Sequence, residues 1–338
     1  MQKKIKIGLA LGGGGARGLA HVGVLKVLER ERIAFQLIVG TSVGALIGAG
    51  YAIEPDAAAL ERRVLDFFQS EGTQNRRIKL LEKMNRRGTE KPDLFHRLMR
   101  IAEKEMALGL MVVRKSLLPE QDLRRIFRAL LPEIDLKDTK IPFCAVAVDL
   151  ISGREVVLKS GRLIPAVMAS CAVPGFMPPV PWEGKVLLDG GIIDPVPCRP
   201  AKEEGAEIVI GVDVGQCICR PRPVEDGIDE IQRAIDIMGF HMNKQSTECA
   251  DVVIEPDVKG IEWTDFAKYK ELIRKGEEAA EREMNKIRRI LPSGFPKRLF
   301  QRASGVIGGA GRGWFAGKFS KSGGKTAVSA NSAPVGTG

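Results

Sequence analysis

The sequence predicts an α/β protein in which helices cover both faces of a sheet, giving three layers. The first 53 residues alternate twice between a strand-like and a helix-like stretch, and several apolar strand-like stretches recur after residue 140. Alternating strands and helices favour a parallel sheet with right-handed crossovers. The chain has 338 residues, 44% of them hydrophobic, which suffices for the core of one large domain.

Four short elements open the chain. Residues 4–11 alternate charged and apolar side chains and then become wholly apolar, as a strand does on entering a sheet, and a run of glycines ends them. Residues 19–33 repeat apolar side chains at helical spacing. An apolar strand at 34–40 and a helix of small residues at 43–53 follow. This order predicts a strand, helix, strand, helix unit.

The remaining chain supplies an insertion, later strands and a tail. Residues 55–132 are charge-rich with a helical pattern, and predict a helical insertion between strands of the sheet. Two helices, roughly 225–246 and 264–290, are expected to close a domain of residues 1–292. Residues 293–338 are rich in Gly, Ser and Ala and predict a disordered basic tail. Further strands are predicted at 141–150, 154–160, 185–191, 206–214 and 251–258.

The positive charge is concentrated in the tail. The net charge is +10, yet residues 293–338 hold seven Lys or Arg and no acid, so residues 1–292 carry 45 basic and 42 acidic residues. A nearly neutral body with few aromatic residues argues against specific nucleic-acid binding. The tail interleaves Phe and Trp with basic residues, so we expect peripheral contact with an anionic membrane surface. A merely solubilising tail is an equal alternative.

Cysteine usage and the N-terminus indicate a cytoplasmic location, peripheral to the inner membrane if the tail binds lipid. The six cysteines lack the repeated close pairs of a disulfide framework or a zinc site, and Cys217 and Cys219 are spaced too tightly for a zinc knuckle. We therefore expect reduced thiols and no metal. The apolar stretch at residues 7–11 is shorter than the roughly 7 residues that a signal peptide needs.

Ser42 lies in a stretch that has two opposed interpretations. Residues 33–53 contain no charge, and a run of roughly 20 apolar residues can span a membrane. The middle of the run, however, reads Gly40-Thr41-Ser42-Val43-Gly44, which is the G-x-S-x-G pattern of a nucleophile elbow. A strand precedes Ser42 and a helix follows it, as that motif requires. An ordinary glycine-rich turn is the alternative.

The glycine run at residues 12–15 also has two interpretations. Gly13-Gly14-Gly15-Ala16-Arg17-Gly18 fits the dinucleotide fingerprint G-x-G-x-x-G. That fingerprint needs an acidic residue at the end of the second strand, where this chain has Gly40-Thr41-Ser42. The run therefore favours an oxyanion hole, in which glycine N–H groups at a helix start bind a carbonyl oxygen.

The base that would activate Ser42 is expected to be a carboxylate. The three histidines, at positions 21, 96 and 241, do not follow a late strand, where a hydrolase triad would place one, and His21 is expected to be structural. Asp149, Asp189 and Asp213 end or interrupt apolar strands. Asp189 is followed by Gly190 and Gly191, which would let a substrate or another backbone approach. The residues alone leave a plain Asp-Gly turn equally open.

Four sequence blocks together resemble the patatin-like phospholipase family in its bacterial single-domain form. They are GGGARG, GTSVG, ASCAVPGFMPP and DGG, in this order within residues 5–215. Two positions depart from the family pattern: Met177 replaces a common Phe or Tyr, and the last block is DGG rather than DGA. Neither change removes a reactive group, so both concern the choice of substrate.

The resemblance implies a catalytic Ser-Asp dyad without histidine on a three-layer α/β/α fold, similar to the catalytic domain of cytosolic phospholipase A2. Ser42 matches the nucleophile and Asp189 the general base. Gly13, Gly14, Gly15 and Arg17 match the oxyanion loop. No cofactor is implied. The expected activity is hydrolysis of carboxylic esters in phospholipids, lysophospholipids or related acyl esters. A catalytically idle regulator or scaffold at the membrane surface is the alternative.

The expected acyl group is fatty because of a second uncharged stretch, residues 163–182. Its five prolines forbid a membrane-spanning helix and predict a stiff apolar wall. In the family this wall lies beside the active site. Part of it is expected to fill the core, and the side chains at 173, 176, 177 and 180 are expected to form a groove for an acyl chain.

Overall fold

The computed structural model describes residues 5–68, 119–215, 218 and 224–291. Within these residues eight strands form one mixed sheet, in the order β5-β6-β3-β2-β1-β7-β8, with β4 paired to β3. The strands are β1 (Ile7–Leu11), β2 (Leu37–Thr41), β3 (Phe143–Asp149), β4 (Glu155–Leu158), β5 (Val180–Trp182), β6 (Lys185–Asp189), β7 (Ile208–Val212) and β8 (Val252–Ile254).

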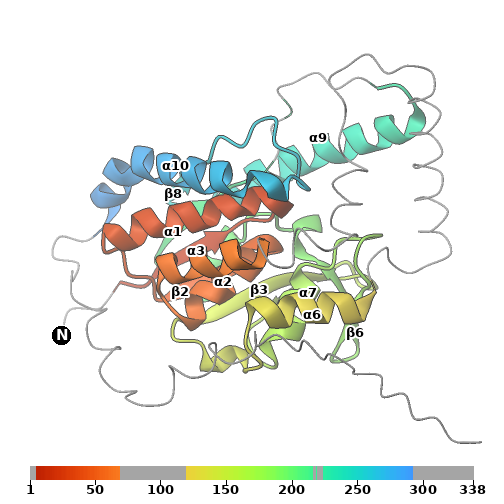
Figure 1. The fold of residues 1–338 in the computed structure, drawn as a ribbon, viewed down its shortest axis with the longest axis horizontal. Helices are drawn as coiled ribbons and strands as arrows, with labels where there is room; N and C mark the ends of the chain where they lie inside the picture. Colours follow the sequence, from red (N-terminus) through yellow and green to blue (C-terminus); the bar gives the residue numbers. More distant parts are fainter. Residues whose placement is uncertain (1–4, 69–118, 216–217, 219–223, 292–338) are drawn as a thin grey trace, which may run out of the picture. The chain divides into compact units, whose positions relative to one another are not determined.

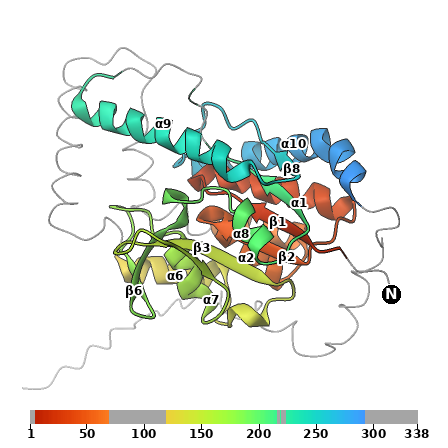
Figure 2. The ribbon, with the colours of Figure 1, turned by 180° about the vertical axis from the view of Figure 1, so that it is seen from behind.

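Helices cover both faces of the sheet, which confirms the predicted α/β class. In Figure 1, α1, α2, α3 and α10 lie in front of the strands, and Figure 2 shows α8 and α9 on the other side. The helices are α1 (Ala20–Arg30), α2 (Val43–Ile53), α3 (Ala57–Phe67), α6 (Glu120–Leu130), α7 (Leu163–Ser170), α8 (Cys198–Glu203), α9 (Gly227–Thr247) and α10 (Tyr269–Ile290), with short 3₁₀ turns η1 (Gly15–Leu19) and η4 (Gly190–Ile192) near the site.

The core explains why residues 33–53 carry no charge. Side chains of a strand alternate between the faces of a sheet, and β2 is buried on both, with Ile38 in the larger core cluster and Val39 in the smaller one. The helix α2 behind it is buried over nearly its whole length. Within the described ranges, no helix combines the length and the apolar character needed to cross a membrane.

The sheet is mixed rather than wholly parallel. The strands β1, β2, β7 and β8 are parallel, and β2 is parallel to β3, as predicted, but β4 and β6 run antiparallel to β3 and β5 antiparallel to β6. The connections explain the difference: residues 150–154 and 183–184 are too few for a crossover helix and form hairpins instead. The edge strand β5 tolerates Pro181 within residues 163–182, the stretch that was predicted to form a stiff apolar wall.

Two predicted segments lie mainly outside the described residues. Of the helical insertion at 55–132, the structure describes α3 and α6 at its ends and leaves out residues 69–118. The basic tail at 293–338 is likewise outside. The extent of the insertion, the domain boundary at 292 and the disorder of the tail therefore stay predictions.

The helices α1 and α10 touch through glycines, and their backbones come close together at two positions. A Cβ atom on Gly276 would come within 1.9 Å of the carbonyl oxygen of Ala20. A Cβ on Gly23 would come equally close, 1.9 Å, to the carbonyl oxygen of Ile273. No side chain larger than hydrogen fits at either position without moving one helix.

We predict that Gly276→Ala lowers the free energy of unfolding by about 1–3 kcal/mol, the usual range for overpacking. This loss outweighs the gain of up to about 1 kcal/mol that Ala brings to a helix. The matched control is Gly239→Ala in α9, where nothing lies within 4 Å of the new Cβ. Chemical denaturation should show a lower free energy of unfolding for Gly276→Ala and a higher one for Gly239→Ala. Equal stabilisation of both variants would contradict the close contact.

Candidate active site

The register of β3 brings the ends of β2 and β6 together. The strand β2 pairs with the first part of β3, ending at Thr41 opposite Val146, and β6 pairs with the last part, with Asp189 opposite Ala147. Because β4 pairs with β3 over both parts, β2 and β6 must share the other edge of β3. The residue after Thr41 therefore meets Asp189, although 147 residues separate Ser42 from Asp189 in the sequence.

Ser42 occupies a strained turn between β2 and α2. Its φ is 56° and its ψ is −127°, a backbone conformation that residues with side chains rarely adopt. The glycines on either side make the turn possible: a Cβ on Gly44 would lie 2.1 Å from the carbonyl oxygen of Leu11, and one on Gly40 would lie 2.5 Å from Cα of Ala45. The turn is the geometry that the G-x-S-x-G pattern predicts.

The side chains of Ser42 and Asp189 are hydrogen-bonded. The Ser42 hydroxyl donates to Oδ2 of Asp189 at 2.6 Å. The other carboxylate oxygen, Oδ1, accepts the N–H of Gly191 at 2.7 Å, which fixes the orientation of the carboxylate. Both side chains are nearly buried, since Ser42 is 9% and Asp189 6% exposed. An alcohol and an acceptor of its proton are thus in contact and largely shielded from solvent.

The surroundings of Asp189 make it a stronger base than a free aspartate. Burial raises the pKa of Asp189 to about 6, while the hydrogen bonds from Ser42 and Gly191 pull it in the opposite direction. The carboxylate is therefore ionised at neutral pH. A pKa closer to neutrality improves its ability to take a proton from an alcohol.

The glycine loop lies directly against Ser42. A Cβ on Gly13 would be 3.3 Å from the Cβ of Ser42. The N–H of Gly13 is directed into the fold, where it donates to the carbonyl oxygen of Pro195 at 2.9 Å. In the described part of the chain, the N–H groups of Gly14 and Gly15 have no such partner. Gly14 lies just before η1 and Gly15 is its first residue, so these two N–H groups are the loop donors that remain for an oxygen acceptor.

Arg17 braces the loop from within. Its Nε donates to the carbonyl oxygen of Gly14 at 3.2 Å, and its side chain is 8% exposed. Its charge also acts on the half-buried Asp213, which accepts the N–H of Gly215 and the side-chain amide of Asn243, each at 2.7 Å. The role of Arg17 in binding an oxyanion stays a prediction, and its contacts in the structure are those of a support for the loop.

Two further residues, one beside Ser42 and one beside the glycine loop, were not singled out from the sequence. Ser170, at the end of α7, accepts the N–H of Ser42 at 2.9 Å and donates to the carbonyl oxygen of Val146 at 2.6 Å. It lies in the ASCAVPGFMPP block, which was the available signal. Trp263 accepts the N–H of Ala16 through its carbonyl oxygen at 2.6 Å. Its ring meets the edge of Phe176 with centroids 4.9 Å apart.

The other candidate bases have structural partners. His21 is fully buried, and its Nε2 lies 2.8 Å from the carbonyl oxygen of Gly12; burial lowers its pKa to about 4, so the ring is neutral and donates this hydrogen bond. Asp149 accepts the hydroxyl of Ser152 at 2.6 Å in the hairpin after β3. His241 is exposed on α9, and His96 lies outside the described residues.

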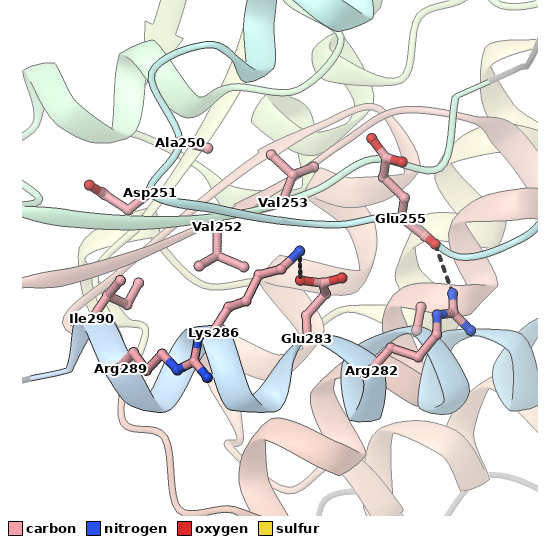
Figure 3. Close-up of a pocket in the computed structure, with 11 residues that line it drawn as sticks. Ala250, Asp251, Val252, Val253, Glu255, Arg282, Glu283, Lys286, Arg289 and Ile290 are labelled. Carbon is pink, nitrogen blue, oxygen red and sulfur yellow. Dashed lines mark hydrogen bonds and ion pairs between the residues drawn. The ribbon is translucent and has the colours of Figure 1, made fainter.

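The expectations of no metal and no cofactor stay predictions. The described residues hold no group of three or more His, Cys, Asp or Glu placed to bind a metal ion, while Cys217 and Cys219 lie outside them. A cavity of about 600 Å³ lies between β8 and α10 (Figure 3). Lys286 and Glu283, both on α10, form an ion pair of 2.7 Å on one wall of the cavity, and none of the predicted site residues lines it.

The fold and the elbow define the class of protein: an α/β protein with a buried serine hydroxyl hydrogen-bonded to a carboxylate beside a glycine loop. Comparison with known proteins agrees. The family model described as patatin-like phospholipase matches residues 9–202, more than half of the chain. The chain belongs to the patatin-like phospholipase family.

Individual relatives share the same segment. The patatin-like phospholipase domain-containing protein ZK370.4 of Caenorhabditis elegans is 32% identical over 211 residues, which are 62% of this chain and 14% of the relative. Lysophospholipase nte1 of Aspergillus fumigatus is 32% identical over 209 residues, 62% of this chain and 12% of the relative. The chain thus matches only about an eighth of the length of these proteins.

A solved structure gives a weaker likeness. The crystal structure of VipD from Legionella pneumophila aligns with 83% of this chain and 66% of its own, at 13% identity and a TM-score of 0.44. A score at that level adds nothing to the family assignment.

The raised pKa of Asp189 predicts how stability changes with pH. The folded protein binds the proton up to about pH 6 and the unfolded chain only up to about 3.8, so the wild type loses stability as pH rises through this window and no further above it. Asp189→Asn removes the titration. The variant should gain stability relative to wild type from pH 4 to 6, reaching on the order of 3 kcal/mol at neutral pH.

Denaturation of both proteins between pH 4 and 8 measures this difference. A gap that stays constant across the whole range would contradict a carboxyl group whose pKa is raised by burial.

Proposed function

We propose that the protein is a lipid acyl hydrolase that cleaves carboxylic ester bonds of phospholipids or lysophospholipids through Ser42 and Asp189. The observation that carries the proposal is the 2.6 Å hydrogen bond from the Ser42 hydroxyl to the buried Asp189 carboxylate. Membership of the patatin-like phospholipase family and a relative named lysophospholipase support the class of substrate.

The first half of the reaction would form an acyl-serine. Asp189 Oδ2 takes the hydroxyl proton as Ser42 Oγ attacks the ester carbonyl carbon, and the carbonyl oxygen becomes an oxyanion. The N–H groups of Gly14 and Gly15 would receive this charge, each donor being worth about 2.7–4 kcal/mol in acyl-transfer enzymes. The tetrahedral intermediate then collapses, the C–O bond to the alcohol breaks, and the alcohol leaves with the proton from Asp189.

The second half would return the enzyme to its starting state. Water attacks the acyl carbonyl carbon while Asp189 takes one of its protons. Collapse of the second intermediate breaks the bond to Ser42 Oγ, which recovers the proton from Asp189, and the fatty acid departs. The same carboxylate thus serves both steps without a histidine. Because an alcohol leaves more readily than an amine, this arrangement favours esters over amides.

The apolar residues beside the glycine loop support a fatty acyl group. Phe176 and Trp263 form an edge-to-face pair at 4.9 Å next to the loop, and Met177 and Val180 pack partly buried against the core. We propose that Val173, Phe176, Met177 and Val180 form one side of a path for the acyl chain. Contact of the basic tail with anionic lipid is part of the same hypothesis and concerns residues outside the described ranges.

Hydrolysis of a lysophospholipid and of a simple acyl ester tests the proposal. Ser42→Ala should fall to background, and Asp189→Asn should lose on the order of 10²–10⁴-fold in kcat/KM, the range for removal of a general base. Asp149→Asn is the matched control, because Asp149 also ends a strand of the sheet but its carboxylate accepts the Ser152 hydroxyl and the N–H of Val186 rather than the Ser42 hydroxyl. That control should keep most of the wild-type rate.

The pH profile provides a second measurement in the same assay. Asp189 must be ionised to act as a base, so kcat/KM of the wild type should fall about tenfold per pH unit below pH 6. Activity that survives in Ser42→Ala, or a profile that is flat down to pH 4, would reject the mechanism. Folded protein without hydrolase activity would instead favour the idle regulator.

A further inference from the structure

A second buried carboxyl group, Asp194, lies next to the site and has no role in the proposed reaction. It is 2% exposed, and both of its carboxylate oxygens lack a hydrogen-bond donor among the described residues. Leaving an ionised carboxylate buried without donors is costly. A protonated carboxyl group avoids this cost, because it is uncharged and can itself donate a hydrogen bond.

The backbone of Asp194 joins the two halves of the site. Its N–H donates to the carbonyl oxygen of Gly190 at 2.8 Å, which closes the turn that follows Asp189. Its carbonyl oxygen accepts the hydroxyl of Thr41 at 2.9 Å, and Thr41 immediately precedes Ser42. A displacement of Asp194 would thus move both the Asp189 turn and the strand end that holds Ser42.

The side chain of Asp194 faces one acid and one base. Glu155 of β4 interacts with it directly, and that carboxylate accepts Nη2 of Arg199 at 3.0 Å. The same Arg199 nitrogen is 4.0 Å from Oδ2 of Asp194. Two carboxylates cannot satisfy each other unless one of them carries a proton. With one proton present, the pair has a single negative charge, which Arg199 balances.

We propose that Asp194 and Glu155 share one proton, with Asp194 as the donor, and that this proton makes Asp194 a positioning residue for Ser42 and Asp189. The neutral cluster anchors the turn after Asp189 against Thr41. Loss of the proton would leave two adjacent carboxylates with one arginine, and their repulsion would push Asp194 away from β4. Only the activity readout below rests on the proposed hydrolysis.

The electrostatic surroundings agree with this assignment. Burial raises the pKa of Asp194 to about 8, and the charge of Glu155 adds to the rise, while Arg199 opposes it. Glu203 of α8 raises it slightly further but is 58% exposed. The thiols of Cys198 and Cys249 also sense Asp194, and burial raises the pKa of each, so they add no charge near neutrality.

The shared proton gives a signature in substrate-free protein. The folded state keeps the proton to about pH 8 and the unfolded state only to about 3.8, so wild-type stability falls as pH rises between these values and is level above pH 8. Asp194→Asn donates to Glu155 at every pH. Its melting temperature relative to wild type should therefore climb through pH 6–8, where the Asp189 difference has already levelled.

The activity readout uses the same variants. Wild-type kcat should fall about tenfold per pH unit above pH 8, and Asp194→Asn should keep its rate there. Asp194→Ala should lose kcat at all pH values with KM unchanged, because it lacks the donor that Asn restores. The control Glu203→Gln removes an exposed carboxylate of the same cluster and should behave as wild type.

Identical pH dependence of melting in wild type and Asp194→Asn would overturn the proposal, whether or not the protein hydrolyses lipid. Should that variant fail to fold, Glu155→Gln serves instead: removal of the like charge should move the stability window of Asp194 to lower pH. An unmoved window would equally overturn the shared proton.

Discussion

The meeting of β2 and β6 on one edge of β3 is the constraint on which the candidate site depends. Three strands pair with β3, and the pairing with β4 leaves a single edge for both β2 and β6. Ser42 follows the last residue of β2, Asp189 is the last residue of β6, and the two side chains meet where these strands end. The hairpin connections that make the sheet mixed are what turn β6 antiparallel, so that its last residue points to the end of β2. The chemistry of the pair follows from strand register.

Burial makes the pair of Ser42 and Asp189 more reactive and also lowers the stability of the fold. The same apolar surroundings that fill the core raise the pKa of Asp189 to about 6, so the base is stronger than an exposed aspartate and the fold is less stable when it ionises. Ser42 adds backbone strain at φ 56°, which the packing of Gly44 on β1 holds in place. Asp194 is a second buried carboxyl group, one turn further along the chain, and its backbone supports the turn that follows Asp189.

Much of this arrangement could be predicted from the sequence, because it depends on patterns among neighbouring residues. Apolar runs marked the strands, and α2 begins and ends where the small-residue stretch does. The glycines around Ser42 marked a turn with an unusual φ. The directions of the strands were harder to predict, because the antiparallel β6 and the edge strand β5 depend on short connections. Pro181 also argued against a strand at β5. The contacts of Ser170, Pro195 and Trp263 with the site could not be predicted, since they join segments distant in sequence; only Ser170 lay in a sequence block that the family resemblance marked. Likewise, only the structure shows that the N–H of Gly13 is hydrogen-bonded within the described part of the fold, unlike those of Gly14 and Gly15.

Mapping the covalent adduct of a fluorophosphonate probe tests the central claim most directly. The probe forms a bond only with a nucleophile that an adjacent base has activated. The account predicts a single adduct on the peptide containing Ser42, no adduct in Ser42→Ala, and slow labelling in Asp189→Asn. An adduct on another residue, or an actively hydrolysing preparation that takes up no probe, would contradict it.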